Sequence, residues 1–352
     1  LFRNNEFSKS LSILKEIENK FDKKDAKYYQ FFYDLLGKNY DKLKKYDLAF
    51  DAFNKRNVKI LNLKENKKFD KQILYNLIES YSNFFVKENI NKYNLFNKID
   101  NYSDPVFLVG FPRSGTTLLD TILRTHSHTI VLEEKPYISN VRDDFFKSNH
   151  NKISSLENID LDKIKDVRKN YFKNIKNFDK KNFSKIIVDK LPLNIIEIGF
   201  IKRIFPKSKF ILMMRHPVDS ILSCFVTNFA VNEAMIHFLE LNDAAKLYTE
   251  VFNLWKQYKK NLDLDFHVIK YENIITDFEK TIKKLLIFLN IEWEDNIKNF
   301  NKIALKRNRI NTPSYNQVIK PLSQDSIGRW KNYDEVKKIK NKLDTWIEYF
   351  DY

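Results

Sequence analysis

The segment PVFLVGFPRSGTTLLDTIL, residues 105–123, most constrains what this chain can fold into. Its apolar run VFLV at 106–109 ends at Gly110, a short loop closes at Gly115, and helical spacing begins near Thr116. Only five glycines occur in 352 residues, and two of them flank this loop. Because glycine adopts backbone conformations that other residues avoid, the pair indicates that the loop needs an unusual backbone conformation. The segment therefore predicts a buried strand, a tight loop and a helix, as at the start of a parallel sheet.

Three further apolar runs repeat this pattern after residue 103. They are KIIV at 185–188, KFILMM at 209–214 and FHVI at 266–269, and each precedes a stretch with helical period. Strands that alternate with helices form a parallel sheet whose ligands bind beyond the carboxyl ends of the strands. We therefore predict an α/β domain over 103–352, with a P-loop-like parallel sheet and flanking helices.

The first 104 residues differ, because they contain none of the eight prolines of the chain. This favours continuous helices joined by short turns. Large and small residues recur there at the spacings of a tetratricopeptide (TPR) unit: Tyr33, Leu36, Gly37, Tyr40, Ala49 and Phe53. We predict an all-α TPR-like helical domain over 1–100, acting as scaffold or as a surface for a protein partner. A plain helical hairpin without repeat ancestry is the alternative.

The net charge of +16 is spread along the chain. Residues 1–100 carry seven more basic than acidic residues, and the other 252 residues carry nine more. Most lysines lie beside asparagine, isoleucine and phenylalanine and form no basic patch, so a solvated surface is favoured over a nucleic-acid site. We expect no nucleic-acid partner, although an anionic substrate would be attracted.

The cellular location is predicted from two features that the sequence lacks, a membrane-spanning segment and a pair of cysteines. No apolar run approaches the roughly 20 residues of a membrane span, so we expect no span in this chain. The single cysteine, Cys224, excludes an intrachain disulfide and gives no sign of an oxidising compartment. The chain begins with Leu1 and not with methionine, so an upstream segment, anchor or leader stays open, and cytoplasm is the expected location.

The loop GFPRSGTT has the chemistry of an anion site. Successive backbone N–H groups at the start of a helix, with the hydroxyls of Thr116 and Thr117, form a cradle for phosphate. Thr116 stands where G-x-x-x-x-G-K-[ST] has the lysine that reaches a γ-phosphate, and Arg113 projects from the loop instead. ATP hydrolysis is therefore disfavoured. A purely structural turn is the alternative.

A second cluster follows in KFILMMRHPVDSILSCF. Arg215 ends the strand, Pro217 suits a helix start, and Ser223 lies eight residues after the arginine, about two turns into that helix. An arginine with a hydroxyl is typical of phosphate binding. The two clusters together predict a ligand with two separated phosphate groups, although a salt-bridge role for Arg215 is the alternative.

These residues carry a resemblance. FPRSGTT and RHPVDSILS resemble the two binding motifs of sulfotransferases that use 3'-phosphoadenosine 5'-phosphosulfate (PAPS). Three more segments, VLEEKP, VDKLPLN and TPSYNQVIKPLSQDSIGRW, resemble protein-tyrosine sulfotransferases and TPR-containing bacterial sulfotransferases. The resemblance spans most of 103–335. It implies that the first loop holds the 5'-phosphosulfate and the second motif the 3'-phosphate.

The resemblance also implies roles for single residues. Glu133 is the general base, with Glu134 as the alternative, and Lys190 and Arg113 supply positive charge to the transferring group. Ser314 lies near the bridging oxygen. The implied donor-binding residues are Arg113, Ser114, Gly115, Thr116, Thr117, Arg215, Ser223, Tyr271, Ser314, Gln317, Lys320 and Arg329. A helix cap at Ser314, a surface position for Arg329 and core packing of Tyr271 are the alternatives.

The predicted function is sulfuryl transfer from PAPS to the hydroxyl or phenol of a small molecule, glycan or protein, with protein tyrosine as one candidate acceptor and 3'-phosphoadenosine 5'-phosphate (PAP) as product. A non-catalytic TPR adaptor with a nucleotide-binding α/β domain is the alternative, and a kinase is disfavoured. Leucine and valine stand where tyrosine sulfotransferases tend to have cysteine, and Thr227 stands where they have arginine, which weakens a tyrosine acceptor. We expect no metal, because His126 and His128 lack a third ligand at a plausible spacing.

Overall fold

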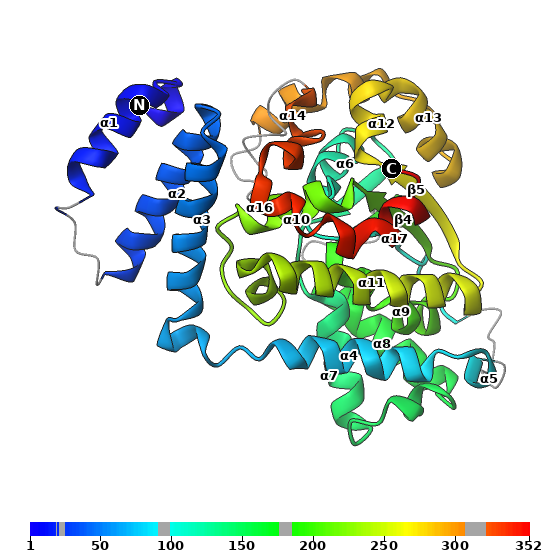
Figure 1. Ribbon diagram of the computed structural model, residues 1–352. Helices are drawn as coiled ribbons and strands as arrows, with labels where there is room; N and C mark the ends of the chain where they lie inside the picture. Colours follow the sequence, from blue (N-terminus) through cyan, green and yellow to red (C-terminus); the bar gives the residue numbers. More distant parts are fainter. Residues whose placement is uncertain (19, 21–24, 91–98, 176–184, 307–321) are drawn as a thin grey trace. The chain divides into compact units, whose positions relative to one another are not determined.

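The chain is represented by a computed structural model that describes residues 1–18, 20, 25–90, 99–175, 185–306 and 322–352 (Figure 1). It contains two compact units. The first combines Leu1–Tyr75, His216–Thr249 and Asp325–Tyr352, and the second combines Asn76–Arg215 and Glu250–Gln324. Two of the boundaries fall inside helices, α4 (Lys71–Phe84) and α11 (Leu241–Asn261). The division into domains 1–100 and 103–352 stays a prediction.

The second unit contains a parallel five-stranded sheet with the order β2–β3–β1–β4–β5. Its strands are β1 (Val106–Gly110), β2 (Thr129–Leu132), β3 (Ile186–Lys190), β4 (Lys209–Met214) and β5 (Asp265–Lys270). The predicted α/β fold class is confirmed. The central strand is β1, and the chain goes from it to β2 and β3 on one side before crossing to β4 and β5 on the other. The loop after β1 therefore lies at the point where parallel sheets of this kind bind ligands.

Helices cover both faces of this sheet, as Figure 1 shows. Val106 and Leu108 of β1 face a hydrophobic core shared with one set of helices: α6 (Thr116–Leu123), α12 (Tyr271–Thr276), α13 (Phe278–Leu289) and α14 (Phe300–Lys306). Phe107 points the other way and lies near Phe205, whose ring also contacts Tyr171. That side holds α8 (Leu161–Asn174) and α9 (Ile198–Ile204). Helices α5 (Lys87–Ile90) and α7 (Tyr137–Ser148) also belong to the unit.

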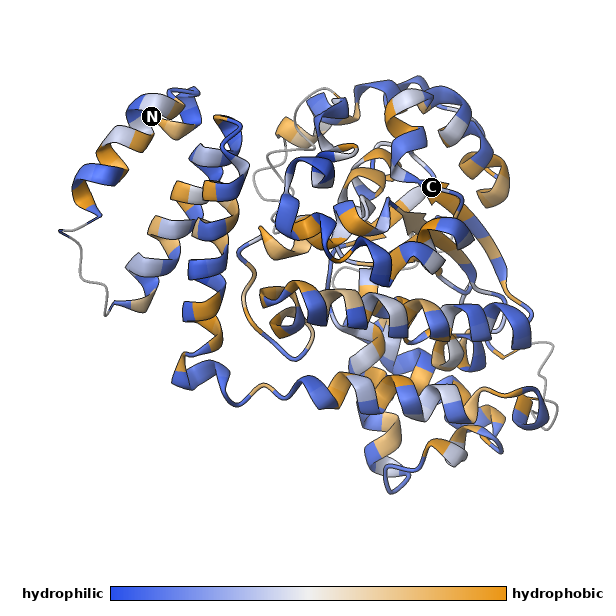
Figure 2. Cartoon of the chain, in the orientation of Figure 1, coloured by the Kyte–Doolittle hydropathy of each residue, from blue (hydrophilic) through white to orange (hydrophobic). Residues whose placement is uncertain are grey.

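The first unit is helical in the residues described. Its N-terminal helices are α1 (Phe7–Ile17), α2 (Ala26–Lys42) and α3 (Tyr46–Leu61), striped with hydrophobic and hydrophilic residues in Figure 2. Helices α2 and α3 approach closely, because a Cβ on Gly37 would lie 2.6 Å from Phe53 Cε1. The helical character of the N-terminal region is thus confirmed, whereas TPR ancestry stays a prediction.

Distant segments complete this unit. They supply α10 (Pro217–Phe225), α16 (Asp334–Lys337) and α17 (Asp344–Tyr349). The fully buried Arg56 of α3 donates to the backbone oxygens of Phe225 (2.8 Å) and Val226 (3.1 Å), and to Asp34 Oδ1 (2.6 Å). One arginine from the N-terminal helices therefore satisfies carbonyls at the end of α10 that the helix itself leaves unpaired.

The C-terminal segment is attached by carboxylates. Asp219, in the first turn of α10, accepts hydrogen bonds from the backbone N–H groups of Gly328 (2.7 Å) and Trp330 (2.9 Å). Its side chain is fully buried, so both carboxylate oxygens are satisfied without water.

No helix in the described residues is long and apolar enough to cross a bilayer.

Candidate active site

Two glycines shape the loop between β1 and α6. A Cβ on Gly110 would lie 2.4 Å from the backbone oxygen of Met213 in β4. Gly115 has a φ of +103°, and a Cβ there would lie 2.7 Å from the Tyr271 ring. A side chain at either position would collide with its neighbour, and Gly115 also needs a conformation that other residues rarely adopt. The loop is therefore held against β4 and the start of α12.

The start of α6 is open to an anion. The N-cap residue is Gly115, which has no side chain to cap the helix, and the first turn contains no acidic residue. Arg113, two residues earlier, has a φ of +68°, an uncommon conformation for a residue with a side chain. Strained backbone of this kind is concentrated at functional sites. The first helical turn begins at Thr116 and Thr117, as the sequence predicted.

The hydroxyl of Ser114 is a buried polar group that lacks a partner. The residue is only 1% exposed, and its Oγ has no hydrogen-bond partner among the described residues. Such a group costs about 1–3 kcal/mol when it stays unsatisfied, so native proteins rarely keep one without a reason. Because this hydroxyl lies inside the loop, a ligand oxygen bound there could satisfy it.

Arg215 connects the loop to Tyr271. Its Nη1 donates to the backbone oxygen of Arg113 at 3.2 Å, and its guanidinium carbon lies 5.1 Å from the centre of the Tyr271 ring. The fold thus brings together four predicted donor-binding residues, Arg113, Gly115, Arg215 and Tyr271. The stacked guanidinium is positioned by the ring and by the loop backbone.

Two further predicted donor-binding residues, Ser223 and Arg329, belong to the first unit. Ser223 is a buried residue of α10, in the first unit. Arg329 belongs to the same unit, where its Nη2 donates to Asp41 Oδ1 of α2 at 2.8 Å. This ion pair gives Arg329 a structural role, and a donor contact for it stays a prediction. Ser314, Gln317 and Lys320 lie outside the described residues.

The end of β3 carries a buried ion cluster. Lys190 is fully buried, with Nζ 2.7 Å from Glu134 Oε1 and 3.4 Å from Asp120 Oδ2. Asp120 also pairs with Arg124, one turn along α6. Side chains from β3, from the segment after β2 and from α6 therefore meet at the Lys190 ammonium group. Glu133, the predicted base, is half-buried directly after β2.

The neighbour of Lys190 along the strand is also unusual. Asp189 is fully buried, and that burial raises the pKa of its carboxyl to about 7, although a hydrogen bond from Tyr171 and the charge of Lys190 oppose the rise. The Tyr171 hydroxyl donates to Oδ2 at 2.8 Å, and Oδ1 has no partner among the described residues. Strand alternation places Asp189 on the opposite face from Lys190.

Sequence reasoning identified Lys190 but missed Asp120 and Asp189. The signal for Asp120 was present, since it is the one charged residue in TTLLDTIL, between the loop and the end of α6. A lone carboxylate in an apolar helix indicates a buried cationic partner. Asp189 stands beside the lysine in VDK, and its apolar strand could have indicated burial.

Comparison with known proteins adds two relatives. An uncharacterized protein of Aquifex aeolicus (strain VF5) is 25% identical over 309 residues, covering 86% of this chain and 39% of that protein. Protein-tyrosine sulfotransferase 1 of Danio rerio is 27% identical over 241 residues, covering 64% of this chain and 65% of that protein. The chain therefore spans less than two thirds of the length of either relative.

The sulfotransferase domain of the Synechococcus PCC 7002 olefin synthase superposes with a TM-score of 0.49 at 18% identity, covering 74% of this chain and 98% of that one. The model of a sulfotransferase family matches residues 105–295, from the start of β1 to the segment after α13. This match includes the loop, the Lys190 cluster, Arg215 and Tyr271 and extends over more than half of the sequence. The chain belongs to the sulfotransferase family.

Proposed function

We propose that the chain transfers a sulfuryl group from PAPS to an acceptor hydroxyl or phenol. The observation that carries this proposal is the Ser114 hydroxyl, which is buried without a partner inside a loop bordered by Arg215. The proposal accounts for the missing lysine after Gly115, since PAPS has no γ-phosphate.

The residues present suit such a donor. The open helix start at Thr116, the Ser114 hydroxyl and the Arg113 side chain would hold the 5'-phosphosulfate. Arg215 would hold the 3'-phosphate, with the Tyr271 ring keeping the guanidinium in place, and the role that the resemblance implies for Ser223 at this phosphate stays a prediction. When bound, the donor supplies an activated sulfuryl group joined to a phosphate leaving group.

Lys190 and Glu133 would act on the reacting atoms. The acceptor oxygen forms a bond to sulfur as the bond from sulfur to the bridging phosphate oxygen breaks, and that oxygen keeps the electron pair. Lys190 and Arg113 stabilise the negative charge that develops there. The acceptor proton passes to a carboxylate, and the products are a sulfated acceptor and PAP.

The structure bears on the choice between the two candidate bases. Lys190 Nζ holds Glu134 Oε1 at 2.7 Å, so a base at that position would have to release the ammonium group first. We propose Glu133 as the base, because the resemblance matches it to the first acid of the pair, and Glu134 as the residue that orients Lys190. The name of the Danio rerio relative favours protein tyrosine as one acceptor, whereas the departures from the tyrosine sulfotransferase pattern, such as Thr227, weaken that choice.

The Ser114 hydroxyl offers a sharp test with a matched control. Ser208, just before β4, is a second buried serine whose Oγ has no partner among the described residues. Ser114→Ala should leave the free protein at least as stable and weaken PAP binding by roughly tenfold, because a charge-assisted hydrogen bond is lost. Ser208→Ala should leave PAP binding unchanged. Equal PAP affinity in both variants would contradict the site.

Turnover tests the reaction and separates an enzyme from an adaptor. PAP formation from PAPS would be measured over a panel of phenols, sugars and tyrosine peptides. Glu133→Gln should lower kcat by about 10²–10⁴-fold, and Glu134→Gln should have a smaller effect. PAP binding without PAP formation for any acceptor would favour the non-catalytic alternative.

A further inference from the structure

The turn between α6 and β2 contains two histidines that the proposed reaction does not use, His126 and His128. It precedes Thr129, whereas Glu133 follows the other end of the same strand, roughly 13 Å away along four residues. The sequence offered no third ligand near these histidines. The fold supplies one, because Glu294, in the segment after α13, lies beside both imidazoles.

The three side chains form a compact set of metal-ligand atoms. Glu294 Oε1 lies 3.5 Å from His126 Nδ1 and 3.6 Å from His128 Nδ1, and all three atoms lie within 4.8 Å of one another. A tetrahedral ion with bonds of about 2.0–2.1 Å separates its ligand atoms by about 3.3–3.4 Å. Two of the three separations are therefore close to those of an occupied tetrahedral site.

Neighbouring groups orient the ligands. The Nε2 of His126 contacts the backbone oxygen of Glu292 at 2.7 Å, and its Nδ1 accepts the backbone N–H of His128 at 3.1 Å. The proton therefore sits on Nε2, and Nδ1 carries the lone pair. A hydrogen bond from the other ring nitrogen to a carbonyl is typical of metal-binding histidine.

The carboxylate is oriented in the same way. The backbone N–H of Ser127 donates to Glu294 Oε2 at 2.9 Å, which leaves Oε1 toward the imidazoles. The Ser127 hydroxyl also donates to Oε1 and lies 3.0 Å from His128 Nδ1. A bound cation would replace two hydrogen bonds, the one from the Ser127 hydroxyl to Glu294 Oε1 and the one from the backbone N–H of His128 to His126 Nδ1.

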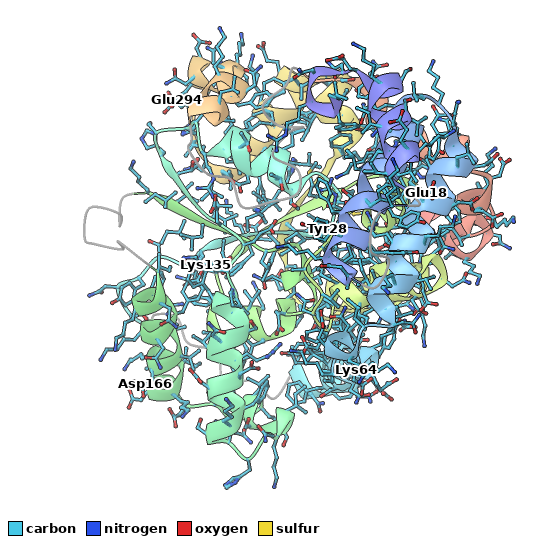
Figure 3. All side chains as sticks on the ribbon, turned by 90° about the vertical axis from the view of Figure 1, so that its left-hand side faces the viewer. Glu18, Tyr28, Lys64, Lys135, Asp166 and Glu294 are labelled. Carbon is cyan, nitrogen blue, oxygen red and sulfur yellow. The ribbon has the colours of Figure 1, made fainter. Side chains whose placement is uncertain are left out.

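We propose that His126, His128 and Glu294 bind Zn²⁺. Two imidazole nitrogens with one carboxylate oxygen are a donor set that Zn²⁺ favours, and a fourth position stays open for water. The His126 side chain is 1% exposed and that of His128 is 64% exposed, so the site has a rigid inner wall and an entry from solvent. Lys135 comes directly after Glu134, at the end of the sheet that carries the Lys190 cluster. Figure 3 shows Glu294 well apart from Lys135.

The bound ion would join the turn before β2 to the segment after α13. Its role is therefore to stabilise the fold at the amino-terminal end of β2. This role is independent of sulfuryl transfer. The proposal needs neither donor nor acceptor, and it stands or falls without the proposed function.

Calorimetric titration of ZnCl₂ into the tag-free full chain, first treated with EDTA, tests the site. The expected result is a single equivalent of Zn²⁺ bound and a higher melting temperature. His128→Gln and Glu294→Gln should each weaken binding by more than about tenfold, the scale at which even outer partners act. The partly exposed His128 makes its variant safe for folding.

Two control variants match these changes. Glu292→Gln keeps the backbone oxygen that contacts His126, and His150→Gln removes an exposed histidine elsewhere, so both should bind Zn²⁺ like the wild type. Co²⁺ would report the geometry through the visible absorption of a tetrahedral complex. No stoichiometric Zn²⁺ uptake, or uptake that His128→Gln and Glu294→Gln leave unchanged, would overturn the proposal.

Discussion

The two units of this chain differ in how their parts are held together. In the unit with the sheet, one face of the sheet shares a continuous apolar core with α6, α12, α13 and α14. The helical unit joins three distant segments, and buried polar groups make important connections: Arg56 to the end of α10, and Asp219 to Gly328 and Trp330. Ser223 and Arg329, two of the predicted donor-binding residues, therefore belong to a unit in which buried side chains connect backbone segments that are far apart in the sequence.

The largest expected effect concerns Arg56. Arg56→Met would leave the Val226 carbonyl without this donor and remove a buried ion pair, although Asp34 would keep Lys38 as a partner. The free energy of unfolding should fall by roughly 3–5 kcal/mol. Denaturant titration measures this, with Lys55→Met as the exposed control one residue away. A loss no larger than that of the control would remove the basis of the comparison.

In the sheet unit, the largest effect is expected on turnover. Lys190→Met would remove the ammonium group between Glu134 and Asp120, and kcat should fall by roughly 10²–10³-fold. Lys185→Met, an exposed position just before the same strand, should retain activity. Steady-state kinetics of PAP release measure kcat for both variants. An unchanged kcat in the Lys190 variant would show that this lysine does not stabilise the transferring group.

A smaller effect is expected at the carboxylate that attaches the C-terminal segment. Asp219→Asn would place an amide donor against one of two buried backbone N–H groups, those of Gly328 and Trp330. The cost should be about 1–3 kcal/mol in the free energy of unfolding. Asp334→Asn, at an exposed position of the same unit, serves as control. Equal stability of the two variants would mean that the segment is held by apolar packing alone.

The smallest effect is a pH dependence in the sheet unit. Burial raises the pKa of Asp189 to about 7, so the folded state binds this proton more tightly than the unfolded state does. The contribution of this proton to stability is complete below the ordinary pKa of about 4 and is lost as the pH rises through about 7.

Asp189→Asn mimics the neutral acid and should remove that part of the slope, at most about 1.4 kcal/mol per pH unit. Unfolding of the wild type and the variant between pH 4 and pH 8 measures the difference. Parallel stability profiles would show that this carboxyl has no raised pKa.

Much of the sheet unit could be predicted from sequence, because its signals are local. Each strand is a short apolar run, and the loop after β1 needs Gly110 and Gly115 within a few residues of each other. The start of α6 at Thr116 followed from the same segment. The candidate donor loop could therefore be predicted from the local sequence, without knowledge of any tertiary contact.

The rest could not be predicted, because it depends on contacts between residues far apart in the chain. Nothing near Arg56 indicates that its partners are carbonyls 169 and 170 residues away. Arg329 reads as a donor-binding residue by position, and only the fold reveals its pairing with Asp41. Glu294 likewise reaches two histidines that seemed isolated in the sequence.

Calorimetric titration of the wild-type chain with PAP, AMP and ATP tests the central claim most directly. A site that holds two separated phosphates should bind PAP roughly 10- to 100-fold more tightly than AMP, through the added charge-assisted contacts at the second phosphate. ATP should bind more weakly than PAP, because no lysine follows Gly115. Equal affinities for the three nucleotides would contradict the proposal that this chain uses PAPS as its sulfuryl donor.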